Sequence, residues 1–127
     1  MACGHRRDGA VYWPTVLTGV PEGVKVDCQE IFGPVVNLYP VADLEEGIAR
    51  ANAVDFGLQA AVFTSGLASA FRAIEGLEAG AVIVNDSTDY RMDAMPFGGI
   101  KQSGLGREGI RFALQEMTEP KTVCFNL

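Results

Sequence analysis

The sequence is poor in several residue types, and each shortage narrows what the protein can be. Its 127 residues include three cysteines, one histidine and one tryptophan. Cys3, Cys28 and Cys124 are odd in number and form no Cys-x-x-Cys pair, which disfavours a disulfide scaffold and fits a reducing compartment. A zinc site built from His5 and these dispersed cysteines is equally disfavoured, so we expect no metal.

Positive charge and long apolar runs are also scarce. Ten lysines and arginines stand against sixteen aspartates and glutamates, for a net charge of −6. Nucleic acids and anionic membranes attract basic surfaces, so we expect neither as a partner. No apolar run is long enough to cross a bilayer, and the first residues do not resemble a signal peptide. These features predict a soluble, cytoplasmic protein.

Apolar residues, by contrast, are abundant at 48% of the chain, which predicts a globular domain or a part of one. Strand-like runs alternate with amphipathic runs, which predicts an α/β fold with a mostly parallel sheet flanked by helices. We expect a loop over 20–30. The expected strands are 10–17, 34–41, 58–64, 81–85 and 121–127, and the expected helices are 43–53, 65–80 and 107–118. In the first strand, Pro14 indicates either an edge position or a break.

Local signals mark the ends and faces of these helices. Asp43 and Glu46 have the spacing of a capping box at the first helix. Gly80 is placed to end the second helix in a left-handed conformation. The residues expected on the inner faces are Leu44, Ile48 and Ala51 in the first helix, Leu67, Phe71, Ile74 and Leu77 in the second, and Ile110, Ala113, Leu114 and Met117 in the third.

The stretch "GLGREG", Gly104–Gly109, matches the dinucleotide pattern G-x-G-x-x-G letter for letter. That fingerprint needs a strand directly before it and an acidic residue about twenty positions after it. Pro96 and the Gly98-Gly99 pair break any preceding strand, and too few residues follow. We therefore interpret these glycines as shaping a loop and the start of the helix near Gly106.

Two longer motifs together resemble the aldehyde dehydrogenase superfamily. They are "QEIFGPVV" (29–36) and "MPFGGIKQSGLGREG" (95–109). The segments "YWPTVL", "RANAVDFGLQAAVFT" and "GLEAGAVIVND" agree in order and spacing. The resemblance predicts a partial catalytic domain at 9–118 after a frayed terminus at 1–8. It also predicts an oligomerisation strand at 119–127, which would make the protein a homo-oligomer.

The resemblance implies oxidation of an aldehyde to a carboxylic acid with NAD or NADP. In the family a cysteine thiolate adds to the aldehyde, hydride passes to the nicotinamide, and a glutamate activates water. Glu30 matches the glutamate that binds the nicotinamide ribose hydroxyls, as a carboxylate can accept from both. Phe32 matches an aromatic near the nicotinamide ring; taken alone, the two would be a solvated charge and a core side chain.

The loop 85–99 implies contacts to the aldehyde. Phe97 matches an aromatic lining the pocket, and Arg91 stands where a guanidinium could hold a carboxylate or phosphonate of the substrate. Plain core packing and an exposed loop arginine are equally good interpretations. Asn85 is expected to turn the chain into this loop. The loop is most similar to members acting on small or anionic aldehydes.

The family's nucleophile has no counterpart in the sequence contexts of the three cysteines, and a Cys3–His5 pair is disfavoured because such dyads join distant positions. We therefore expect no catalytic residue here. The main hypothesis is the C-terminal part of an NAD(P)-dependent aldehyde dehydrogenase, inactive alone. The alternatives are a non-catalytic interaction module of the same origin and a minimal enzyme that uses one of its own cysteines.

Overall fold

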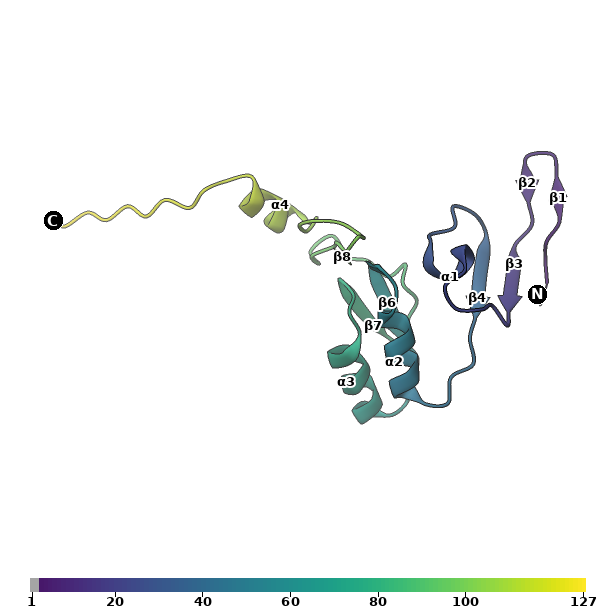
Figure 1. Ribbon diagram of the computed structural model, residues 1–127. Helices are drawn as coiled ribbons and strands as arrows, with labels where there is room; N and C mark the ends of the chain where they lie inside the picture. The colour runs from purple at the N-terminus through teal and green to yellow at the C-terminus, as the bar shows by residue number, and fades with distance from the viewer. Residues whose placement is uncertain (1–2) are drawn as a thin grey trace. The chain divides into compact units, whose positions relative to one another are not determined.

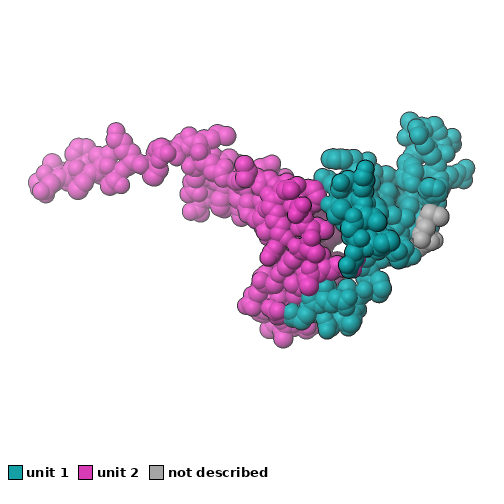
Figure 2. Space-filling model, in the orientation of Figure 1, with its two compact units in different colours: residues 1–47 teal, residues 48–127 magenta. Residues whose placement is uncertain are grey.

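The computed structural model describes residues 3–127 (Figure 1). The chain divides into two compact units, residues 1–47 and 48–127 (Figure 2). Helix α2, Leu44–Asn52, begins in the first unit and ends in the second. No helix in the described residues is long and apolar enough to cross a membrane.

The first unit is built from two strand pairs. Strands β1 (Arg7–Asp8) and β2 (Val11–Tyr12) form an antiparallel hairpin. Strands β3 (Thr15–Thr18) and β4 (Val35–Leu38) pair in parallel, with Thr15 opposite Val35. The connection between β3 and β4 contains the short helix α1, Lys25–Cys28.

One expectation for the first unit needs correction, and another stays a prediction. Residues 1–2 of the expected frayed terminus lie outside the described residues. Within 3–8, Arg7–Asp8 belong to the hairpin and Cys3 pairs with Val16 through two backbone hydrogen bonds of 3.4 and 3.1 Å, so fraying of the terminus stays a prediction. The expected loop 20–30 contains α1, whose start is fixed by a hydrogen bond from the Gly23 amide to Asp27 (2.8 Å). The break, one of the two interpretations of Pro14, is confirmed, since β2 ends at Tyr12 and β3 begins at Thr15.

The second unit contains the remaining elements. Strands β6 (Gln59–Val62) and β7 (Ala81–Val84) pair in parallel. Helix α3 (Leu67–Gly76) lies between them in the chain, so the three elements form a β-α-β crossover. Strands β5 (Phe56–Gly57) and β8 (Ile100–Lys101) pair antiparallel. Helix α4 spans Ile110–Glu116. The buried apolar side chains are Ile48, Ala70, Ala73 and Ile83.

Two asparagines join the ends of neighbouring elements in this unit. Asn52 donates to the Gly76 carbonyl (2.7 Å) and accepts from the Glu78 amide (2.8 Å), which joins the ends of α2 and α3. Asn85 donates to the Thr64 carbonyl (2.9 Å) and accepts from the Thr64 amide (2.8 Å). Asn85 adopts φ 60°, so its expected role in turning the chain after β7 is confirmed.

The capping box of α2 forms in a shifted version. The Asp43 carboxylate accepts from the Glu46 amide at 2.9 Å, as expected. The Glu46 carboxylate reaches the amide of Ala42 at 2.7 Å, one residue before the predicted position. The result still satisfies two amides at the start of the helix.

The expected inner face of α3 is wrong for this chain. Leu67 is 73% exposed and Phe71 56% exposed, whereas Ala70 and Ala73 are buried. The helix therefore turns its small side chains inward and leaves its large ones uncovered. Gly80 does not end the helix in a left-handed conformation, since α3 ends at Gly76; a Cβ on Gly80 would instead collide with the carbonyl of Gly98.

The C-terminal segment is exposed as well. On α4, Ile110 and Leu114 are 83% and 63% exposed, so most of the face predicted to be inner is uncovered in the described residues, whereas Ala113 is half-buried. Residues 118–127 form neither helix nor strand within this single chain. A strand needs a neighbour to pair with, so the oligomerisation strand at 119–127 stays a prediction.

Candidate functional site

The segment that carries Glu30 and Phe32 is a tight turn between α1 and β4. The Gly33 amide bonds the Ile31 carbonyl (2.8 Å), and the Val35 amide bonds the Gly33 carbonyl (2.8 Å). The end of the turn is tied to β3, because the Thr15 amide donates to the Pro34 carbonyl (2.8 Å). The backbone is thus folded back on itself between α1 and β4.

Helix α1 is anchored beneath this turn by two polar contacts from β4 and the residue after it. Asn37 donates to the Val26 carbonyl at 2.6 Å. The Tyr39 hydroxyl donates to the Asp27 carboxylate at 2.7 Å. These bonds fix the position from which the chain enters the turn.

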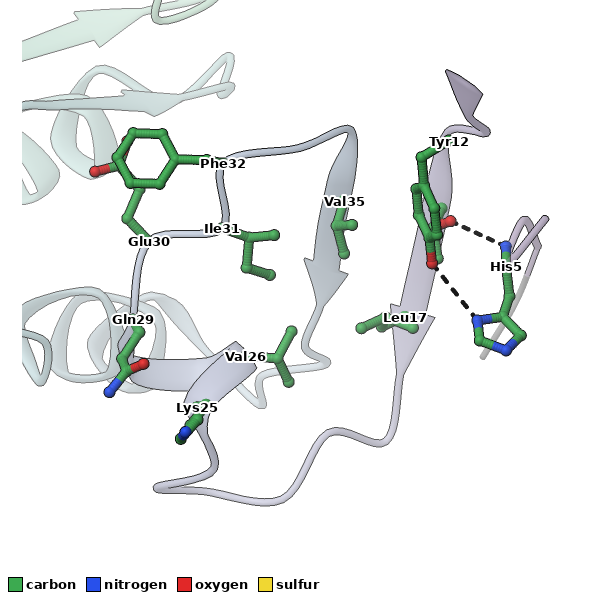
Figure 3. Close-up of a pocket in the computed structure, with 11 residues that line it drawn as sticks. His5, Tyr12, Leu17, Lys25, Val26, Gln29, Glu30, Ile31, Phe32 and Val35 are labelled. Atoms are coloured by element: carbon green, nitrogen blue, oxygen red, sulfur yellow. Dashed lines mark hydrogen bonds between the residues drawn. The ribbon is translucent and has the colours of Figure 1, made fainter. Parts of the chain in front are cut away.

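Glu30 and Phe32 line one cavity of about 540 Å³ within the first unit (Figure 3). Phe32 is 94% exposed, and within residues 3–127 no group donates a hydrogen bond to the Glu30 carboxylate. Glu30 is the single acidic residue of the lining. The other lining residues are His5, Tyr12, Thr15, Leu17, Lys25, Val26, Gln29, Ile31 and Val35. The wall of the cavity is therefore mostly apolar and carries one carboxylate together with the Lys25 ammonium and the Gln29 amide. The carboxylate suits a ligand with hydroxyl donors.

The cysteines are exposed and free. The backbone of Cys3 pairs with Val16, and the imidazole Nδ1 of His5 lies 3.5 Å from the Tyr12 hydroxyl. The thiol of Cys28 donates to the Val24 carbonyl at 3.3 Å. In the part of the chain that the structure describes, no three histidine, cysteine or acidic side chains gather as a metal site would require.

In the second unit, the loop after β7 is held at its far end by a two-residue backbone pairing. The Phe97 amide donates to the Glu108 carbonyl (3.0 Å), and the Glu108 amide donates to the Phe97 carbonyl (2.6 Å). This antiparallel bridge joins the end of the long loop to the glycine-rich segment before α4.

Arg91 lies against both residues of that bridge. Its guanidinium carbon is 4.2 Å from the centre of the Phe97 ring, and its Nη2 is 3.0 Å from a Glu108 carboxylate oxygen. The Arg91 and Glu108 side chains are 45% and 70% exposed. The structure therefore brings the two residues predicted to face the aldehyde, Arg91 and Phe97, into direct contact.

The segment "GLGREG" already holds a carboxylate of this chain. The Arg107 amide donates to Glu116 at 3.0 Å, and the Arg107 guanidinium donates to the carbonyls of Gly99 (3.1 Å) and Gly106 (2.7 Å). Gly106 and Gly109 adopt φ 69° and 115°, and α4 begins after Gly109, three residues later than expected. These glycines shape a turn closed by Glu116, which agrees with the rejection of a dinucleotide fingerprint.

Sequence reasoning missed Glu108 and Glu116 as partners of these segments. Both lie in or near a motif, but no periodicity connects Glu108 to Arg91, which is 17 residues away. The signal that could have indicated these contacts was opposite charge, because each carboxylate has an arginine in or near the same loop.

Comparison with known proteins identifies the family. A model of the aldehyde dehydrogenase family matches residues 1–123. The chain belongs to the aldehyde dehydrogenase family. It is 49% identical to aspartate-semialdehyde dehydrogenase 1 of Pseudomonas canavaninivorans over 127 residues, which is 100% of this chain and 27% of that protein. It is also 49% identical to a putative aldehyde-dehydrogenase-like protein of Sinorhizobium fredii, over 99% of this chain and 25% of that protein.

Solved aldehyde dehydrogenase structures share the fold. The structure of aldehyde dehydrogenase 21 from Physcomitrella patens, in complex with the reaction product succinate, matches with a TM-score of 0.89 and 44% identity, over 93% of this chain and 24% of that one. Other similar structures are complexes with NADP or NAD⁺. The expected α/β fold and family are thereby confirmed, and the chain spans about a quarter of the length of the relatives that it matches.

Proposed function

We propose that this chain is the C-terminal part of an NAD(P)-dependent aldehyde dehydrogenase that oxidises a small or anionic aldehyde to a carboxylic acid, with an anionic one favoured by Arg91. The observation that carries this proposal is the placement of Glu30 and Phe32 on one cavity of a chain that belongs to the family. In this proposal the complete enzyme acts in the cytoplasm.

The cavity fits the nicotinamide end of the cofactor. Its volume of about 540 Å³ lies in the range of small-ligand sites, and its walls are mostly apolar. The free Glu30 carboxylate accepts from two ribose hydroxyls, and the exposed Phe32 ring offers a flat apolar surface to the nicotinamide. When bound, the cofactor supplies the hydride acceptor of the reaction.

On the aldehyde side, Arg91 and Phe97 form the pocket contacts. The guanidinium recognises a negatively charged group on the substrate, and the ring packs against the carbon chain. Relatives of this chain include an aspartate-semialdehyde dehydrogenase and a 3-sulfolactaldehyde dehydrogenase, whose named substrates carry such a group. These names support an anionic aldehyde.

The nucleophilic cysteine, in this proposal, belongs to a part of the enzyme outside these residues, so the chain is inactive alone. Residues 9–118 contribute to the catalytic domain, and residues 119–127 pair with a neighbouring subunit to form a homo-oligomer. Exposed apolar side chains in that tail support pairing, since Val123 is 63% and Phe125 83% exposed.

The test is a chimera in which this chain replaces the C-terminal quarter of the Pseudomonas canavaninivorans relative. We expect aspartate semialdehyde-dependent NAD(P)H formation from the chimera and none from the chain alone. A folded but inactive chimera would contradict the proposal. Activity of the chain alone, abolished by Cys→Ser, would favour a minimal enzyme.

The same tail exposure favours a second candidate, a non-catalytic module that associates through residues 119–127. Stable oligomers of the chain alone, together with an inactive chimera, would establish it over the dehydrogenase.

A further inference from the structure

The backbone places the Phe97 ring and the Glu108 carboxylate beside each other. Directly opposed residues of an antiparallel pair project their side chains to the same side, and both hydrogen bonds of this pair are made. Their proximity is thus set by main-chain bonds between the loop and the glycine-rich segment.

Arg91 uses both neighbours at once. One face of the guanidinium lies over the ring at 4.2 Å, and one edge donates to the carboxylate at 3.0 Å. A guanidinium has five N–H donors in a planar fork, and the fork is what recognises an anionic group bidentately. Glu108 therefore occupies one donor of the Arg91 fork, at Nη2, and an anion that binds the fork through Nη2 competes with Glu108 for it.

We propose that Glu108 is a specificity-determining counter-ion of the aldehyde site, which a negatively charged group of the substrate displaces from Arg91. The inference rests on the proposed function, in which Arg91 anchors the substrate. A neutral ligand replaces the Glu108 carboxylate less favourably than an anion does, because the guanidinium would lose its charged partner. An anionic ligand replaces one charge-assisted contact with another, while stacking on Phe97 keeps the guanidinium in place.

The competition has a definite sign and size. An internal partner lowers the apparent affinity of a ligand for the same donors, so removing the Glu108 charge tightens anion binding. Because the ion pair is exposed, its contribution is small, and we expect about a two- to fivefold decrease in the dissociation constant.

The test follows the Arg91 side-chain Nε–Hε resonance of the 127-residue chain during titration with methylphosphonate, acetate and neutral acetamide. Glu108→Gln keeps the shape and the backbone bridge. We expect it to tighten both anions about two- to fivefold and to leave acetamide without saturable binding. Glu75→Gln, the same change at an exposed position on α3, should leave all three titrations unaltered.

Arg91→Gln completes the double-mutant cycle, because in that background Glu108→Gln should change nothing in a titration followed by the Phe97 and Glu108 amide resonances.

Unchanged anion affinity in Glu108→Gln, an equal gain in Glu75→Gln, or no anion binding at Arg91 would each overturn the inference. The chimera separates this from the proposed function: an active chimera with an unresponsive Glu108→Gln leaves the dehydrogenase standing. Displacement at Arg91 with an inactive chimera leaves an anion site without the enzyme.

Discussion

In the first unit, Glu30 and Phe32 project from a hydrogen-bonded turn without side-chain partners, whereas in the second unit Arg91 contacts both Phe97 and Glu108. Both pairs combine one charge with one aromatic ring. The difference is that the first pair is left open to a ligand and the second is satisfied internally. A ligand of the first pair would meet a free carboxylate, whereas under the inference above an anion at the second pair displaces one.

The largest expected effect comes from a change in the backbone next to the second pair, Arg91 and Phe97, because it would remove the contact on which the comparison rests. In Gly80→Ala the new Cβ would collide with the Gly98 carbonyl, next to Phe97. The carbonyl groups that the new Cβ would meet belong to packed main chain and have no flexible end that could move aside. We therefore expect a loss of about 3 kcal/mol or more in stability, with loss of the Arg91–Phe97 contact. Urea unfolding followed by circular dichroism measures it.

Gly47→Ala is the matched control, because a Cβ there meets only the Val41 side chain at 3.7 Å, in ordinary contact. It should be neutral or slightly stabilising within α2. Equal effects of the two changes would mean that the second site does not depend on this close backbone approach.

The openness of the first site is tested by Glu30→Gln in the chimera. Gln retains one carbonyl acceptor and loses the charge, so we expect KM for the dinucleotide to rise about tenfold, the loss of one charge-assisted hydrogen bond. Steady-state kinetics with varied NAD or NADP measures this. Glu75→Gln serves as control, and an unchanged KM in Glu30→Gln would remove Glu30 from the cofactor site.

A smaller effect is expected at the base of the second loop. Asn85→Ala removes two hydrogen bonds to Thr64 and places alanine at φ 60°, at a cost of about 1–2 kcal/mol for this exposed position. Asn85→Gly relieves the backbone strain alone and should recover part of the loss in the same urea measurement. If glycine were no better than alanine, the left-handed backbone would not contribute.

The smallest effect is expected at Phe32, and it is measured against the other aromatic ring, Phe97. Phe32 is 94% exposed, so Phe32→Ala should alter stability by less than about 0.5 kcal/mol. Phe97 is half-buried and stacks on Arg91, so Phe97→Ala should cost about 1–2 kcal/mol. Equal losses of stability for the two variants in thermal unfolding would contradict the conclusion that Phe32 is open to a ligand while Phe97 is held by contacts within the chain.

Much of the fold could be predicted from local patterns. The strands at β4, β6 and β7 and the helices α2, α3 and α4 occur where valine-rich runs and amphipathic spacing indicated. Their faces could not be predicted as well, because spacing identifies an apolar face without identifying what covers it. Phe71 is uncovered in this chain, and Ala73 takes the buried place.

The sequence by itself determined the family and the α/β class, because these depend on motifs that are contiguous in the chain. The cofactor and substrate contacts of Glu30, Phe32, Arg91 and Phe97 stay predictions. Only the tertiary structure decided that Glu108 pairs with Arg91, that Glu116 closes the glycine-rich turn, and that Gly80 serves a close backbone approach. Each of these joins residues from separate segments, and a contact across a fold leaves no periodicity or spacing in the linear sequence.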